Sequence, residues 1–314
     1  MLRLLDQVPV IRALGGVAIS SMSSKGGGPT PSLPGEWIRQ TLPPRSAALI
    51  RDYVRHVGGD PAWYRGRVPA HLFPQWGFPL AARAIAGTSY PMARVVNAGC
   101  RIEQRAPLPP GEPLEVAARL ESVDDDGRRA ILTTTIITGT KSAPEALFAE
   151  LRAHVPLGRP GDKNGSATGS QKEKPNKAPK RRPSVPVVAR EIAFMRIGRH
   201  AGWDFAKLTG DINPLHWVPP YARAAGFRSV ILHGFSTLAR AIEAVDRDVL
   251  CGDVDALAVV EARFTRPLLL PASVGVYVTR DQGLYVGDAP GGGAYLEGHF
   301  ETRTTAHTQD SNHG

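Results

Sequence analysis

A basic stretch near the middle of the chain most constrains the fold, because it separates two segments of similar length. Between Pro160 and Pro183 it carries seven Lys and Arg residues against two acidic residues, it is rich in Gly, Ser, Pro and Asn, and it has no aromatic residue. Such a composition buries too little apolar surface to order itself, so we interpret it as a solvated linker. The 314 residues are therefore predicted to form two domains.

The predicted organisation has five parts. They are an N-terminal arm over residues 1–30, a first domain over 31–160, the basic linker over 161–184, a second domain over 185–306 and a disordered tail over 307–314. The arm combines Arg3 and Arg12 with apolar residues, while Asp6 and Pro9 interrupt the apolar run. Two interpretations of it stay open, a frayed or surface-docked segment and a weak targeting leader.

The two domains repeat one order of elements, in which a strand and a helix precede an irregular passage, an apolar helix and several strands. The first helices are predicted over 46–57 and 196–208, and the apolar helices over 78–86 and 234–245. Strands are predicted over 94–103, 112–123, 128–138 and 147–154, and again over 256–265, 273–280, 283–288 and 294–302. The run Asp124-Asp125-Asp126-Gly127 is typical of a tight hairpin turn. The pattern predicts an α+β protein in which an antiparallel sheet wraps round a central helix, twice.

Charge and composition exclude several classes of protein. Of the net charge of +9, the linker alone contributes +5, because its seven basic residues outnumber its two acidic residues by five. Without interleaved aromatic residues or a recognition motif, this charge does not indicate a nucleic-acid partner. No apolar run approaches the roughly 20 residues that cross a bilayer, so we expect no stable membrane insertion. Cys100 and Cys251 suggest neither a disulfide scaffold nor a metal site, which favours a cytoplasmic protein without metal or cofactor.

The run from Phe205 to Ala222 carries the strongest indication of chemistry. It places the carboxylate of Asp211 five residues before the imidazole of His216. Three residues keep this stretch from continuing as a helix: Gly210, Asn213 and Pro214. An acid and a histidine on a stiff turn can move protons and orient a water molecule. A lone pair of this kind is otherwise a loop-capping Asp beside a surface His, so the surrounding residues decide.

A second motif follows, where Ile231-Leu232-His233-Gly234-Phe235 opens an apolar helix. Backbone N–H groups at a helix start have no partner within the helix and can hold a developing oxyanion. Gly234 is the best candidate donor, since a residue without a Cβ lets a substrate approach the backbone.

Together these motifs resemble the signature of the R-specific enoyl-CoA hydratases, the MaoC-like group, which contains Gly-Asp-x-Asn-Pro-aliphatic-His. The matching positions are Leu208, Thr209, Gly210, Asp211, Asn213, Pro214, Leu215, His216 and Ala222. The resemblance is strong over 185–300 and is limited to element order over 31–160. It implies a double hotdog fold and the reversible addition of water to a trans-2-enoyl thioester of CoA or acyl carrier protein, giving the (R)-3-hydroxyacyl thioester.

The resemblance also implies roles for individual residues. Asp211, His216 and the N–H of Gly234 are the expected catalytic groups. The candidates for substrate binding are Asn213, His233, Phe227, Arg263 and Arg266. Each of these has an alternative role: Asn213 fixing the loop, His233 capping the helix, Phe227 packing, and the two arginines on a solvated strand face.

The first domain departs from the motif, because Gly58-Gly59-Asp60-Pro61 is followed by Arg65 where a histidine is required. We therefore expect one active site per chain, with small residues along the helix at 78–86 leaving room for a longer acyl chain. Two rival functions stay open, a hotdog thioesterase and a non-catalytic acyl-thioester-binding partner subunit. Because two hotdogs in one chain already supply the usual pair, a monomer and a homodimer are both expected states.

Overall fold

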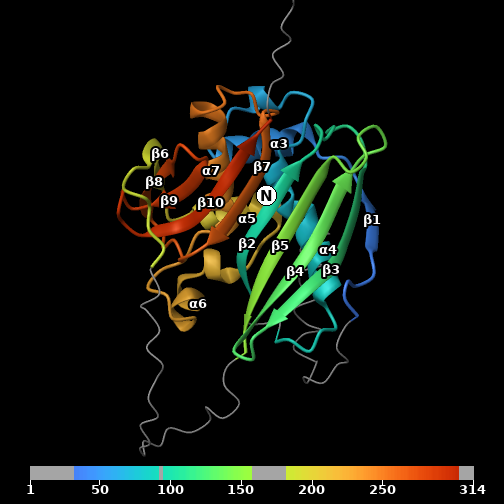
Figure 1. Cartoon of the computed structure of the whole chain (residues 1–314), viewed down its shortest axis with the longest axis horizontal. Coiled ribbons are helices and arrows are strands. Elements are labelled where there is room, and N and C mark those ends of the chain that lie inside the picture. Colours follow the sequence, from blue (N-terminus) through green and yellow to red (C-terminus); the bar gives the residue numbers. More distant parts are fainter. Residues whose placement is uncertain (1–31, 92–94, 158–181, 304–314) are drawn as a thin grey trace, which may run out of the picture.

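One antiparallel sheet of ten strands organises the whole molecule, and helices cover one of its faces (Figure 1). This computed structural model describes residues 32–91, 95–157 and 182–303. The sequence predictions for the N-terminal arm, for nearly all of the linker and for the C-terminal tail lie outside the described residues.

The N-terminal half contributes five strands and two main helices. In chain order they are β1 (Ile38–Leu42), α3 (Ala47–His56), η1 (Pro61–Tyr64), η2 (Ala70–Leu72), α4 (Pro74–Ile85), β2 (Val96–Gln104), β3 (Leu114–Asp125), β4 (Arg129–Gly139) and β5 (Leu147–Pro156). Local chemistry sets several of these bounds. The Ser46 hydroxyl accepts a hydrogen bond from the N–H of Leu49 and so caps α3. Gly127, with φ of +73°, makes the β3–β4 turn that the sequence predicted.

The C-terminal half repeats this order, including two short helical elements before its long helix. Its elements are β6 (Arg190–Ile197), α5 (Ala201–Thr209), η4 (Pro214–His216), α6 (Pro219–Ala224), α7 (Gly234–Asp248), β7 (Leu257–Phe264), β8 (Ala272–Val278), β9 (Gly283–Gly287) and β10 (Ala294–Thr302). The short elements η4 and α6 each begin with proline, whose missing N–H costs nothing in the first turn of a helix.

The two halves meet edge to edge. The strand order is β1-β3-β4-β5-β2-β7-β10-β9-β8-β6, so within the described residues the strands of the two halves pair only through β2 and β7. In that pair Gly99 lies opposite Arg263 and Glu103 lies opposite Val259. The result is one continuous sheet rather than two separate ones.

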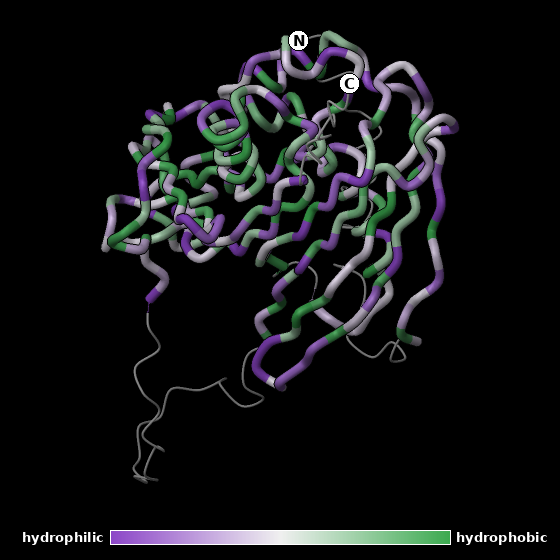
Figure 2. The backbone as a smooth tube through the Cα atoms, turned by 45° about the horizontal axis from the view of Figure 1, so that its top comes forward, coloured by the Kyte–Doolittle hydropathy of each residue, from purple (hydrophilic) through white to green (hydrophobic). Residues whose placement is uncertain are grey.

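Each half wraps its part of the sheet round a central helix. Helix α4 packs on β1, β3 and β4, and helix α7 packs on β6, β7, β9 and β10. Along the strands hydrophobic and hydrophilic residues alternate, as Figure 2 shows, so one face of the sheet meets the helices and the other carries polar residues. The predicted α+β double hotdog fold is confirmed.

The observed elements also correct two predictions. The helix expected over 196–208 begins only at Ala201, because Arg196 and Ile197 pair with β8 as the end of β6. The helix expected over 78–86 begins four residues earlier, at Pro74, and includes Pro79. The prolines suggested an irregular passage, yet Pro74 occupies the first helical position, where proline fits. The domain boundaries at residues 31, 160, 185 and 306 stay predictions.

The seam between β2 and β7 depends on close approach of the two backbones. A Cβ at Gly99 would lie 2.2 Å from the carbonyl oxygen of Ala262 on β7. We predict that Gly99→Ala lowers the free energy of unfolding by about 1–3 kcal/mol, measured by urea denaturation. Gly111→Ala is the matched control, because nothing lies within 4 Å of a Cβ there. Equal effects of the two substitutions would show that the close contact at the seam does not limit stability.

Candidate active site

The motif loop leaves α5 through a left-handed glycine. Gly210 has φ of +78°, and its N–H donates to the carbonyl of Ala206, which ends the helix and turns the chain toward Asp211. The Asp211 carboxylate then accepts a 3.4 Å hydrogen bond from the N–H of Asn213. Asn213 caps the next element, since its side-chain oxygen accepts from the N–H of Leu215 at 3.1 Å. The Asn213 side chain thus bonds the loop backbone, and its role in substrate binding stays a prediction.

His216 ends η4, and a hydrogen bond to a backbone carbonyl orients its ring. Its Nδ1 lies 2.9 Å from the carbonyl oxygen of Ile231, so Nδ1 carries the proton and donates it to that oxygen. The lone pair of Nε2 is then left to accept a hydrogen bond from another group. The backbone of His216 also presses on α5, because a Cβ at Gly202 would lie 2.0 Å from the His216 carbonyl oxygen.

His233 lies directly behind His216. The two imidazole rings stack, with centroids 3.6 Å apart and planes inclined by 25°. Nε2 of His233 donates to the backbone carbonyl of Asp211 at 3.1 Å and lies 3.8 Å from the Asp211 carboxylate. The ring of Phe205 covers it, at a centroid distance of 5.0 Å. His233 therefore ties the start of α7 to the motif loop, and its side chain makes no capping hydrogen bond of its own.

Burial keeps His233 neutral. Removal from water, reinforced by the neighbouring His216, lowers the pKa of His233 from its ordinary value of 6.5 to about 3, despite the opposing effect of Asp211. His56 on α3 behaves similarly, because burial and the nearby guanidinium of Arg240 lower its pKa to about 4. The histidine behind the site is thus a fixed hydrogen-bond donor rather than an acid.

The N-terminus of α7 opens beside this cluster. Among the described residues the N–H of Gly234 has no hydrogen-bond partner, as the first turn of a helix requires. A Cβ at Gly234 would lie 2.9 Å from the ring of Phe264, so only glycine fits beneath that ring. Phe235, the next residue, packs edge-on against Phe73 and Phe78 of the N-terminal half. Aromatic rings from both halves therefore surround the start of α7.

Asp211, His216 and His233 also meet the spacing of a metal site, since ligating atoms of all three lie within 4.8 Å of one another. The contacts of the two rings count against such a use. The Nδ1 of His216 and the Nε2 of His233 each donate to a carbonyl, and stacked rings direct their in-plane lone pairs side by side rather than at one point. The arrangement suits proton transfer better than metal binding.

The other predicted site residues are only partly brought together. Asn213 is exposed beside Asp211, and Phe227 is half-buried against the main core. Arg263 lies on β7 between Ala262 and Phe264, so it points away from the helices; it is exposed and pairs with Glu297. Arg266 stacks on the ring of Tyr295, 5.1 Å away. Binding of a carrier phosphate by these two arginines stays a prediction.

Sequence reasoning missed three residues that shape the site. Gly202 admits the His216 backbone, Phe264 covers Gly234, and Ile231 supplies the carbonyl that fixes His216. Only Gly202 leaves a signal in the sequence, because an isolated glycine within a helical pattern usually has a packing reason.

Comparison with known proteins agrees with this geometry. The MaoC-like domain family matches residues 170–285. An enoyl-CoA hydratase of Mycobacterium tuberculosis is 29% identical over 57% of this chain and 58% of its own length. The 3-hydroxyacyl-thioester dehydratase X of the same organism is 27% identical over 81% of this chain and 84% of its own length. The peroxisomal enoyl-CoA hydratase 2 of Arabidopsis thaliana is 30% identical, and the match spans 58% of its length.

Solved structures agree on the fold. The crystal structure of HtdX of Mycobacterium tuberculosis superposes with a TM-score of 0.65 at 22% identity, covering 85% of this chain and all of that one. The full-length peroxisomal multifunctional enzyme type 2 of Drosophila melanogaster superposes with a TM-score of 0.63 at 18% identity, covering 94% of this chain and 52% of that one. At these identities the likeness concerns the fold alone.

The approach of the His216 backbone to Gly202 gives a test of the site geometry. Gly202→Ala places a methyl group where the His216 carbonyl lies, so the loop must shift away from α5. We predict that kcat falls about 100-fold, because misplacing a reacting group by about 1 Å costs a factor of that size. Gly198→Ala is the control, because a Cβ there meets nothing within 4 Å. Wild-type turnover in Gly202→Ala would contradict this account.

The low pKa values of His56 and His233 predict acid lability. Both groups stay neutral in the folded state, while in the unfolded state they bind a proton below about pH 6.5. Their contribution to stability is therefore complete above pH 6.5 and is lost as the pH falls toward about 4 and about 3. Asp246 has the opposite effect on the pH dependence of stability, because burial raises its pKa.

A paired comparison isolates one histidine. Between pH 6.5 and 5, His56→Gln should lose less unfolding free energy than the wild type, by about 1 kcal/mol per pH unit. Urea denaturation at several pH values measures this difference, and Asp246 cancels because both proteins contain it. Parallel curves would show that His56 remains able to bind a proton in the folded state.

Proposed function

We propose that the protein catalyses the reversible addition of water to trans-2-enoyl thioesters, on the premise that residues 170–285 match the MaoC-like domain family. The product is the (R)-3-hydroxyacyl thioester, and the reverse reaction is its dehydration. The names of the relatives, enoyl-CoA hydratase and 3-hydroxyacyl-thioester dehydratase, support this reaction and a thioester of CoA as substrate.

One observation carries the proposal: ligating atoms of Asp211 and His216 lie within 4.8 Å of each other. Because Nδ1 of His216 donates to Ile231, Nε2 is left with a lone pair that can accept a hydrogen bond. A water molecule that donates one hydrogen to Nε2 and the other to the Asp211 carboxylate turns an oxygen lone pair outward. Such a water is oriented for attack on the β-carbon of an enoyl thioester.

The N–H of Gly234 completes the arrangement. As water adds to the β-carbon, electrons of the double bond move to the thioester oxygen, which becomes an enolate. An N–H at a helix start stabilises that charge, and removing such a donor typically costs about 2.7–4 kcal/mol of barrier. The proton taken from water is then delivered to the α-carbon, so one O–H bond and the π bond of the enoyl group break while one C–O and one C–H bond form.

The proposal extends to the assembly and location of the protein. Since β2 and β7 join the two halves in one sheet, a single chain holds a complete hotdog pair, so both a monomer and a homodimer satisfy the site. Within the described residues no helix has the length and apolar character needed to cross a bilayer. A cytoplasmic location stays a prediction, as does the choice between CoA and acyl carrier protein.

The proposal also leaves the length of the acyl chain open. A Cβ at Gly77 on α4 would lie 3.0 Å from Ile136 and 3.2 Å from Phe73, so the small size of Gly77 already serves packing. Room for a long chain along α4 stays a prediction.

The direct test is loss of enoyl absorbance with crotonyl-CoA and with a trans-2-enoyl-CoA of eight to twelve carbons, in buffer that contains EDTA. We predict that the wild type hydrates at least one substrate to the (R) product and that Asp211→Asn lowers turnover by about 10²–10⁴-fold. Asp248→Asn makes the same chemical change at the exposed end of α7 and should retain wild-type activity.

Other products would overturn the proposal. Release of free CoA thiol without hydration would assign a thioesterase, and binding of the enoyl thioester without turnover would assign a non-catalytic subunit. Activity that requires an added divalent ion would instead favour the metal arrangement of Asp211, His216 and His233.

A further inference from the structure

The N-terminal half contains a buried counterpart of the active site, although its sequence lacks the motif. Gly58 follows the end of α3 as Gly210 follows α5, both glycines are left-handed with φ of +89° and +78°, and the two helices pack together. Tyr53 precedes Gly58 by five residues, just as Phe205 precedes Gly210 by five. The two loops therefore start from equivalent positions.

Each of these aromatic rings lies against a histidine that stands before a central helix. The ring of Tyr53 is stacked on His71, 5.5 Å away, and His71 precedes α4. The ring of Phe205 is 5.0 Å from His233, which precedes α7. His71 is thus the counterpart of His233.

The carboxylate of this second arrangement comes from the opposite half. Gly59 follows Gly58 as Asp211 follows Gly210, but it has no side chain. A Cβ at Gly59 would lie 2.0 Å from Oε2 of Glu243, so the Glu243 carboxylate occupies the space into which a side chain at position 59 would project. Oε1 of Glu243 lies 3.2 Å from Nε2 of His71. Asp211 and His233 make the corresponding approach at 3.8 Å.

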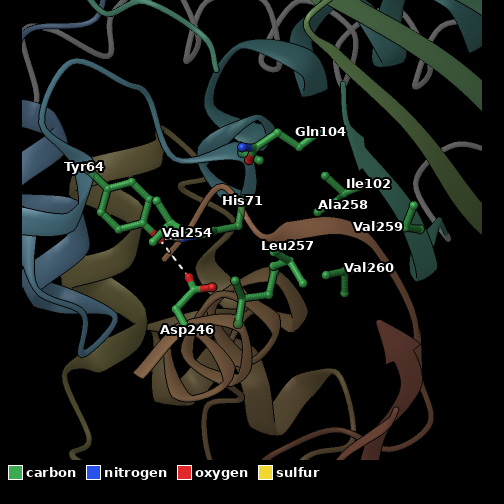
Figure 3. A pocket seen from close by; sticks show the side chains of 12 residues that line it. Tyr64, His71, Ile102, Gln104, Asp246, Val254, Leu257, Ala258, Val259 and Val260 are labelled. Atoms are coloured by element: carbon green, nitrogen blue, oxygen red, sulfur yellow. Dashed lines mark hydrogen bonds between the residues drawn. The ribbon is translucent and has the colours of Figure 1, made fainter. Parts of the chain in front are cut away.

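Two tyrosines complete the network around His71. The Tyr53 hydroxyl donates to the His71 carbonyl at 2.9 Å and so accepts from Nδ1, 3.1 Å away. The Tyr64 hydroxyl lies 3.1 Å from Nε2 of His71 and donates to Asp246 on α7 at 3.1 Å. Figure 3 shows Tyr64, His71 and Asp246 converging from both halves, with the Tyr64–Asp246 hydrogen bond dashed.

This arrangement is closed to substrate. Glu243 is 1% exposed and His71 is 4% exposed, whereas the Asp211 side chain is 23% exposed. The adjoining cavity holds about 20 Å³, which is room for about one water molecule. Among the described residues neither Glu243 oxygen makes a well-aligned hydrogen bond, and burying a carboxylate in this way costs free energy.

We propose that Glu243 and His71 position helix α7, and with it the N-terminal turn that carries Gly234. Helix α7 is continuous from Gly234 to Asp248, and nine residues, about 14 Å, separate Glu243 from Gly234. A polar contact at one fixed point sets the register of a helix more sharply than interchangeable apolar contacts do. That α7 serves catalysis rests on the proposed function; that Glu243 fixes α7 does not.

The test removes the carboxylate of Glu243 from α7 and supplies one from the N-terminal half instead. Glu243→Ala removes it, and Gly59→Asp combined with Glu243→Ala returns a carboxylate from the N-terminal half, as Asp211 is provided in the C-terminal half. Gly59 has no left-handed backbone that would disfavour a side chain. Asp248→Asn on the same helix is the control. Amide hydrogen exchange at residues 236–238 and kcat and KM for the enoyl thioester are measured on all four proteins.

We expect Glu243→Ala to speed exchange at residues 236–238, whose N–H groups are hydrogen-bonded in the helix, by at least 10-fold and to lower kcat about 10-fold with KM within 2-fold of wild type. The double variant should restore both, and Asp248→Asn should change neither. Faster exchange confined to residues near 243, with kcat unchanged, would overturn the proposal. If the wild type hydrates no enoyl thioester, only the proposed function fails, because the exchange at residues 236–238 still tests the positioning of α7.

Discussion

The pairing of β2 with β7 is the constraint on which the rest of the molecule depends. It fixes the two halves edge to edge, and the helices on one face of the sheet must then share a single layer. Helix α3 packs on α5, and Phe73 and Phe78 reach Phe235 at the start of α7. The half without the motif is thereby part of the wall of the only motif-bearing site in the described residues.

The site itself depends on backbone acceptors more than on ion pairs. The carbonyl of Ile231 determines which nitrogen of His216 is protonated, and the carbonyl of Asp211 holds His233. Burial keeps the imidazole of His233 neutral, so this ring adds no positive charge that would compete for the Asp211 carboxylate. Two stacked histidines can then have different roles, because the ring of His233 holds the loop while Nε2 of His216 is left to accept a hydrogen bond.

Much of this organisation was predictable, because it follows from local rules. Apolar periodicity and turn residues located the strands to within about two residues, and the Gly210–His216 motif located the acid and the imidazole. The rest depends on contacts between distant segments. No local pattern shows that Phe264 covers Gly234 or that Arg263 faces away from the helices. The proline at position 74 misled the assignment of α4, because proline both starts and interrupts helices.

Glu243 projects into the space that a side chain at Gly59 would fill, and this has a consequence for how such a chain can change. Neither residue can be exchanged freely without the other, although 184 positions separate them in the sequence. A chimera that joins the first half of one relative to the second half of another would keep both folds and still risk an unmatched glycine or glutamate. The two halves are thereby interdependent, because a substitution at one of these positions changes which residue fits at the other.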